Sequence, residues 1–234
     1  MQQFIQNLFT DFIELVFPSA CLGCGQIIAS GEVILCTTCR FSLPETNHHH
    51  AGQQDLSNKF AGKIPVTAAY SFLHFTKGGT VQRLIHRIKY NGRKEAGREV
   101  ARWYGSQLAA ENQIITKADI LVGVPMHKSR LRQRGYNQAD WIAEGMAEGL
   151  GISCRTDVLI RIKFAGSQTR RNRLERWQNV KTVFAVAKPD DVVGKHIIVV
   201  DDVMTTGATL EACAIELLKA GCREVSVLTL AATR

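Results

Sequence analysis

Apolar residues follow two alternating kinds of spacing from residue 65 onward. Short continuous apolar runs predict buried strands, and apolar positions three and four residues apart predict helices. We expect strands over Ala68–Phe75, Asp119–Val124, Ile197–Val200 and Val225–Leu230. We expect helices over Thr80–Lys89, Glu95–Ala110 and Tyr136–Leu150, and one more helix that closes at Gly221. Because strands that are apolar throughout are buried on both faces, this order predicts an α/β fold with a parallel sheet flanked by helices.

The first 60 residues follow a different pattern. Apolar residues at helical spacing over residues 4–17 predict a small amphipathic helix that ends at Pro18. Its favoured role is packing on this protein, and docking to a partner or a membrane surface is the alternative. A cysteine-rich segment follows, then a polar connector with His48-His49-His50, for which we expect a solvated loop rather than a ligand cluster. The pattern predicts two domains, residues 1–60 and residues 61–234.

Composition narrows the class of protein. The 234 residues are 45% hydrophobic, enough for one substantial core, and the formal net charge of +8 favours an acidic ligand or partner. No run of about 18 apolar residues is present, so we expect no membrane-spanning helix. The start Met1-Gln2-Gln3 has no basic residue, so we expect no secretory signal. Seven cysteines, four of them closely spaced, favour a reducing, cytoplasmic location over a disulfide framework.

Two C-x₂-C pairs are the strongest metal signal in the chain. They are Cys21 with Cys24 and Cys36 with Cys39, and eleven residues separate the pairs. Each pair can place two thiolates around one cation, so the two pairs supply a closed tetrahedral site. Such a site has no open position for water, which favours structural zinc. A rubredoxin-like iron site and redox-active thiols are the alternatives.

The segment 197–210 combines a predicted strand, two acids and a turn that opens a helix. Asp201 and Asp202 can accept hydrogen bonds from ribose hydroxyls, and Thr205–Thr209 can surround a phosphate with backbone N–H groups and hydroxyls. The alternative is a buried strand with a capped helix and merely exposed acids. A Walker B strand also ends in acids, but the chain contains no G-x-x-x-x-G-K-[ST]. The pattern favours a sugar-phosphate site.

The stretch VVDDVMTTGATL, residues 199–210, closely resembles the signature of type I phosphoribosyltransferases, which bind phosphoribosyl pyrophosphate (PRPP). The wider arrangement resembles the ComF family, whose members join a small zinc-binding N-terminal module to this domain. Matching segments are the two cysteine pairs, Ile88–Gly92, Val124–His127, Arg134–Gln138, and Ser167-Gln168 with the Arg-rich stretch after it. The resemblance spans nearly the whole chain. It implies the type I phosphoribosyltransferase fold, with a mobile loop over the active site.

The resemblance also assigns residues to the site. Those expected to bind PRPP are Lys89, Tyr90, Pro125, Met126, His127, Asp201, Asp202, Thr205, Thr206, Gly207, Ala208 and Thr209. The expected catalytic residues are Asp201, Asp202, Arg170 and Arg171. The two arginines lie in the expected catalytic loop, residues 161–184, with Gln168, Arg173, Arg176 and Asn179. Magnesium would bind mainly to oxygens of PRPP. For the arginine-rich loop the alternative is a solvated basic loop without a role in binding. For Lys89 the alternative is an ordinary surface lysine.

Two functions remain open. The first is a PRPP-dependent phosphoribosyltransferase that releases pyrophosphate and acts on an unknown acceptor. The second, implied by the competence role of the ComF family, is a non-catalytic accessory of natural transformation that associates with single-stranded DNA and uses the domain as a nucleotide sensor or platform. Zinc knuckles and the positive charge are compatible with DNA contact, whereas aromatic residues are few. We expect no glutamine amidotransfer, which would require an N-terminal cysteine.

Overall fold

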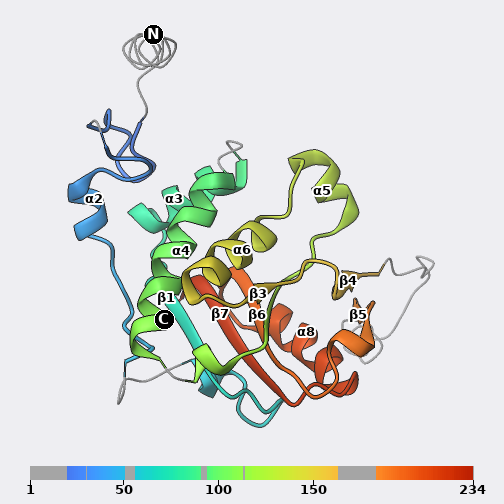
Figure 1. The fold of residues 1–234 in the computed structure, drawn as a ribbon. Coiled ribbons are helices and arrows are strands. Elements are labelled where there is room, and N and C mark those ends of the chain that lie inside the picture. The colour runs from blue at the N-terminus through green and yellow to red at the C-terminus, as the bar shows by residue number, and fades with distance from the viewer. Residues whose placement is uncertain are drawn as a thin grey trace, which may run out of the picture.

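A parallel sheet forms the centre of the computed structural model (Figure 1). The structure describes residues 20–29, 31–50, 56–90, 94–112, 114–162 and 183–233. The strand order is β1 (Ala69–His74), β7 (Glu224–Ala232), β6 (His196–Met204), β2 (Ile120–Gly123) and β3 (Ser153–Cys154). All four neighbouring pairs are parallel. The α/β fold class and the four expected strands are therefore confirmed.

Helices cover both faces of this sheet. Figure 1 shows α3 (Thr80–Tyr90), α4 (Lys94–Glu111) and α6 (Gln138–Leu150) on one face, and α8 (Ala208–Lys219) on the other. The alternation along β6 explains both layers, because Ile198 and Val200 pack into the first core while Ile197 and Val199 pack into the second. All four residues are fully buried, as expected for a central strand of a parallel sheet.

Glycines allow α4 and α6 to pack unusually closely. A Cβ atom at Gly145 would overlap the backbone oxygen of Arg98, and one at Gly149 would overlap the backbone oxygen of Arg102. The backbones can therefore approach only because these positions have no side chain. This contact fixes α4 against α6.

The N-terminal part of the described chain packs beside α3. It contains the cysteine-rich segment with the short helix α2 (Thr37–Phe41). Arg83 donates from Nε to the Gly23 carbonyl oxygen at 2.9 Å, and Arg87 donates from Nη1 to that of Cys21 at 2.6 Å. Farther along, Glu45 forms an antiparallel bridge with Leu73 of β1. The proposed division into residues 1–60 and 61–234 stays a prediction.

Several short elements were not expected from the sequence. They are α2, β3, α5 (Lys128–Arg134), β4 (Leu159–Arg161), β5 (Phe184–Val186), and the 3₁₀ turns η1 (Ser57–Lys59), η2 (Ile115–Lys117) and η3 (Pro189–Asp191). β4 and β5 pair antiparallel as the stem of a hairpin. Their short lengths give little periodicity to detect. The expected first helix lies outside the described residues.

β6 also runs farther than expected. The sequence predicted that the strand ends before Asp201, but the structure extends it to Met204. Its pairing with β7 continues through Asp201 and Val203, opposite Thr229 and Ala231. The pairing with β7 therefore continues the strand past the two acids, where the sequence predicted that it ends. No helix among the described residues is long and apolar enough to cross a membrane.

Candidate functional site at the carboxyl edge of the sheet

Two neighbouring strands bring the expected ligand-binding segments to one edge. β2 and β6 are parallel neighbours, with Gly123 opposite Val200, and the Val124 N–H donates to the Val200 carbonyl oxygen at 2.9 Å. The segment Val124–His127 after β2 and the turn Thr205–Gly207 after β6 therefore leave the sheet side by side. The carboxyl edge of a parallel sheet is where open α/β folds bind ligands.

The two adjacent acids are turned in different directions. Asp202 is 5% exposed, and its Oδ2 lies 2.7 Å from Nζ of Lys89, the penultimate residue of α3. The Asp201 carboxylate is instead close enough to Cys213 of α8 to contribute to raising the pKa of that buried thiol. Successive strand residues point to opposite faces, so one acid belongs to the α3 side and the other to the α8 side.

The surroundings of Asp201 strongly raise its pKa. Burial and the neighbouring Asp202 carboxylate raise the pKa of Asp201 to about 7, although the Asp202 N–H, 2.8 Å from Asp201 Oδ1, and Lys89 lower it. A carboxyl group with a pKa near 7 can hold or release a proton at physiological pH. The edge therefore carries one acid paired with a lysine and one that titrates near neutrality.

The turn after β6 leaves the first turn of α8 open. Gly207 is the N-cap, with φ of 80°, and no side chain caps the helix. The Thr206 hydroxyl lies 3.4 Å from the Ala208 N–H, a long hydrogen bond. A Cβ atom at Gly207 would lie 3.3 Å from the Phe60 ring, so both the left-handed conformation and the close approach favour glycine. A helix N-terminus of this kind attracts an anion.

A lysine from the connector braces this turn. Lys59 Nζ donates to the carbonyl oxygens of Thr205 at 3.1 Å and Thr233 at 2.9 Å. Phe60, 1% exposed, packs beneath Gly207 in the same core as α8. Sequence reasoning missed both residues because they lie about 145 residues upstream of the turn, in a connector with no motif.

A polar cavity of about 390 Å³ opens beside Lys89, the ion-pair partner of Asp202. It is lined by Lys89, Tyr90, Arg130, Gln133, Arg134 and Tyr136. The Arg134 guanidinium lies over the Tyr90 ring, 5.1 Å from its centroid, and the Tyr136 hydroxyl donates to the Ile88 carbonyl oxygen. The cavity is thus basic with one exposed aromatic ring. Arg130 and Gln133 were missed because α5 itself was not expected.

His127 has a local structural role. It is the N-cap of α5, and its Nδ1 accepts from the Ser129 N–H at 3.2 Å and lies 2.6 Å from the Ser129 hydroxyl. Pro125 and Met126 lie in the irregular segment between β2 and this cap. Arg170, Arg171, Gln168, Arg173, Arg176 and Asn179 lie outside the described residues. The hairpin β4–β5 on either side of that segment places Arg161 over the Phe184 ring, 5.4 Å from its centroid.

The four cysteines of the N-terminal segment form a compact cluster. Their sulfur atoms all lie within 4.8 Å of one another. The N–H groups of Gly23 and Cys36 donate to the Cys21 sulfur at 3.3 and 3.2 Å, and the Cys39 N–H donates to the Cys36 sulfur at 3.4 Å. A Cβ atom at Gly23 would lie 2.9 Å from the Cys39 sulfur, so the tight turn depends on glycine.

The four thiols would need a cation between them to ionise together. Burial opposes ionisation of Cys21, but backbone N–H groups lower its pKa to about 6. Burial and the three neighbouring sulfurs raise the pKa of Cys39 to about 12. Four thiolates at such distances repel one another unless a cation neutralises them. The donor set therefore suits zinc, which remains a proposal.

Comparison with known proteins agrees with this architecture. A model of the phosphoribosyl transferase domain matches residues 140–234, which hold α6, β6, the turn and α8. The solved B. subtilis glutamine PRPP amidotransferase is similar with a TM-score of 0.41 and 26% identity, over 57% of this chain and 26% of that one. The fold is that of a type I phosphoribosyltransferase, a parallel sheet flanked by helices, with a four-cysteine cluster before it.

Curated relatives extend the likeness. "DNA utilization protein YhgH" of Salmonella typhi is 31% identical over 152 residues, 64% of this chain and 66%, just under two thirds, of its own length. The Escherichia coli K12 protein of the same name is 26% identical and aligns over 94% of this chain and 99% of its own. "Competence protein F" of Haemophilus influenzae is 30% identical over 63% of this chain and 66% of its own. The likeness to these relatives supports the ComF family that the sequence motifs indicate.

Proposed function

We propose that this protein binds PRPP at the carboxyl edge of the sheet and transfers its phosphoribosyl group to an acceptor. The observation that carries the proposal is the uncapped N-terminus of α8, placed directly after Asp201 and Asp202 and braced by Lys59. The match to the phosphoribosyl transferase domain covers this same segment.

Each group has a role that its chemistry supports. Backbone N–H groups and hydroxyls of Thr205–Thr209 bind the 5′-phosphate, because the helix N-terminus supplies unpaired donors and a positive field. Asp202 accepts hydrogen bonds from the ribose hydroxyls, and Lys89, now paired with it at 2.7 Å, is released toward the pyrophosphate. Pro125, Met126 and His127 line the pyrophosphate side of the edge.

The reaction is a displacement at ribose C1. The bond from C1 to the pyrophosphate oxygen breaks, and pyrophosphate leaves with the electron pair. A nucleophilic atom of the acceptor forms the new bond to C1 and loses its proton, which Asp201, with a pKa near 7, is suited to accept. Arg170 and Arg171 would stabilise the departing pyrophosphate. Magnesium bound to PRPP neutralises part of the phosphate charge.

Titration calorimetry with the magnesium salt of PRPP tests the proposal. We expect saturable binding by the full chain and at least a tenfold loss in Asp202→Asn, because a charged hydrogen bond contributes about 1.5–3 kcal/mol. Asp190→Asn, an exposed acid of η3, is the matched control and should bind like the parent protein. Absence of binding by the parent protein, or equal binding by Asp202→Asn, would contradict the assigned site.

A second candidate function is association with single-stranded DNA. It is supported by the names of the relatives, a DNA utilization protein and a competence protein, and by the basic cavity with its exposed Tyr90 ring. Anisotropy of a labelled oligothymidine should then respond to Arg130→Gln but not to Asp202→Asn. Equal affinity of the parent protein and Arg130→Gln would remove the cavity from this function.

A further inference from the structure

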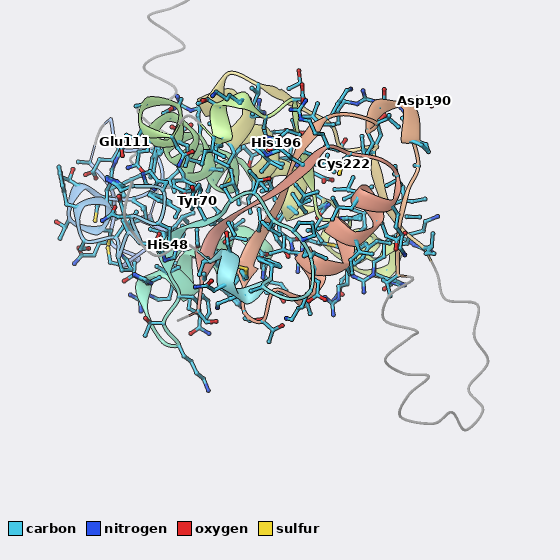
Figure 2. All side chains as sticks on the ribbon, turned by 90° about the horizontal axis from the view of Figure 1, so that it is seen from below. His48, Tyr70, Glu111, Asp190, His196 and Cys222 are labelled. Atoms are coloured by element: carbon cyan, nitrogen blue, oxygen red, sulfur yellow. The ribbon has the colours of Figure 1, made fainter. Side chains whose placement is uncertain are left out.

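Two histidines of the connector meet the last residue of α4. Nε2 of His49 lies 3.4 Å from Oε2 of Glu111, and Nε2 of His50 lies 3.0 Å from the same oxygen. One ligand atom from each of the three residues lies within 4.8 Å of the others. The expectation of a solvated histidine loop is wrong for His49, which is 5% exposed. Figure 2 labels Glu111 and His48 on the same side of the molecule.

A tight turn fixes the position of the two histidines. Asn47 is the only non-glycine residue with positive φ, 56°, in the described part of the chain, and its carbonyl oxygen accepts from the His50 N–H at 3.1 Å. The Thr46 N–H donates to the Phe72 carbonyl oxygen of β1 at 2.9 Å. The turn is therefore anchored to the sheet, and asparagine tolerates the conformation that it requires.

The end of α4 is tied to the same turn. The Asn112 side chain donates from Nδ2 to the His49 carbonyl oxygen at 3.0 Å. Its Oδ1 accepts from the N–H groups of Ile114 and Ile115, each at 3.1 Å. The backbones that carry His49 and Glu111 are thus held together independently of the imidazole and carboxylate groups. The backbone therefore holds the three side chains near one another before any ion binds.

The His49 ring lacks the partners that a buried imidazole needs. Its side chain is 3% exposed, it packs edge-on to the Tyr104 ring at 5.5 Å, and neither Nδ1 nor Nε2 makes a hydrogen bond with any residue that the structure describes. A buried polar atom without a partner destabilises a fold, so such an atom indicates a group that the protein binds. Nε2 faces Glu111 without hydrogen-bond geometry, which leaves a place for an ion between them.

The charge at this end of α4 also favours a cation. Glu111 is the last residue of the helix, where unpaired carbonyl groups already give a negative end. A cation bound there would neutralise both the Glu111 carboxylate and the negative carbonyl end of α4. Two imidazoles and one carboxylate suit zinc and related transition ions, and they do not suit Mg²⁺ or Ca²⁺, which require oxygen ligands.

We propose that His49, His50 and Glu111 form a second metal site, for Zn²⁺ or a similar divalent transition ion, separate from the four-cysteine cluster. Three protein ligands leave the fourth tetrahedral position to water, in contrast to the closed set of four thiolates. The bound ion joins the connector to the end of α4 and thereby stabilises the turn. This assignment is independent of any reaction at the carboxyl edge.

Counting bound zinc tests the second site directly. The full-length protein is equilibrated with zinc in the presence of excess weak chelator, and zinc per chain is measured by mass spectrometry. We expect two ions in the parent protein and one in His50→Ala and in Glu111→Gln. Both changes are at half-exposed side chains, so folding should be preserved, whereas His49 is buried and unsuited to the test. Circular dichroism checks that each variant is folded.

His86→Ala is the matched control, because His86 is an exposed histidine of α3 outside the cluster. It should retain two ions and the rise in melting temperature that zinc produces in the parent protein, which His50→Ala should lose in part. Equal zinc content in the parent protein, His50→Ala and Glu111→Gln would overturn the proposal and leave a metal-free histidine–carboxylate contact. A similar loss in His86→Ala would also overturn it, because it would show adventitious binding at surface histidines only.

Discussion

The four-cysteine cluster and the carboxyl edge of the sheet are built over very different lengths of chain. All four thiols come from residues 21–39, and their turns are set by glycines and short backbone hydrogen bonds within that segment. The carboxyl edge combines Lys59, Lys89, Asp202 and the start of α8, which only the folded sheet brings together. Local spacing therefore specifies the first region, and tertiary packing specifies the second.

Replacing one thiol should affect the first region strongly and the second hardly at all. In Cys39→Ser we expect the loss of one zinc ion per chain, because structural zinc sites of this kind contribute about 10–16 kcal/mol of apparent binding free energy. PRPP affinity should change by less than about threefold, since sites without shared partners combine nearly additively. The shared helix α3 stays in place through its buried residues Val81, Leu84, Ile85 and Ile88.

Zinc analysis and PRPP calorimetry on the same preparation check this independence. Cys154→Ser is the control, because burial raises the pKa of Cys154 to about 12 and keeps it a neutral thiol outside the cluster. It should keep its full zinc content. A tenfold loss of PRPP affinity in Cys39→Ser would show instead that Arg83 and Arg87 transmit the state of the cluster to Lys89.

The same difference explains what the sequence could and could not predict. Continuous apolar runs were enough to predict β1, β2, β6 and β7, because burial on both faces of the sheet makes these strands apolar throughout. Apolar residues at helical spacing were enough to predict α3, α4, α6 and α8. The four-cysteine cluster could be predicted from the spacing of the two C-x₂-C pairs alone. Lys59 and Phe60 carry no motif, and their partners near Gly207 are found only after folding. His49 likewise becomes a candidate ligand only once α4 ends beside it.

Asp140 lies under the carboxyl edge and should make stability depend on pH. Burial, opposed by a hydrogen bond from Asn137, raises its pKa from 3.8 to about 7 in the folded protein. The unfolded chain therefore loses this proton between about pH 4 and pH 7 while the folded chain keeps it, so stability falls as pH rises through that window. Asp140→Asn should remove this loss and be more stable than the parent protein at pH 8, by an amount on the order of 2 kcal/mol.

Urea unfolding at pH 5 and pH 8 measures this effect. The advantage of Asp140→Asn should be small at pH 5 and larger at pH 8. Asp190→Asn, at an exposed acid, should show no such pH-dependent difference. Figure 2 labels Asp190 on the opposite side of the molecule from Glu111, so this control also leaves the histidine cluster untouched. An advantage of Asp140→Asn that is equal at both pH values would assign the effect to packing rather than to ionisation.

The smallest expected effect concerns the hydrogen bonds from Lys59 that hold the turn Thr205–Gly207. Lys59→Met keeps most of the aliphatic stem but removes the donor to the carbonyl oxygens of Thr205 and Thr233. Since a charged donor to backbone carbonyls contributes about 1.5 kcal/mol or less at a half-exposed position, PRPP affinity should fall by roughly three- to tenfold. Melting temperature should fall by only a few degrees, because Phe60 still packs beneath Gly207.

Calorimetry of Lys59→Met beside Lys117→Met separates bracing from the general loss of positive charge. Lys117 is an exposed residue of η2, so its replacement removes the same charge without changing the turn Thr205–Gly207. If both variants lost PRPP affinity equally, the loss of one positive charge from the protein's electrostatic field would account for the effect. A loss confined to Lys59→Met would show that a connector residue far upstream in the chain stabilises the site, the property that most clearly distinguishes this edge from the locally built cysteine cluster.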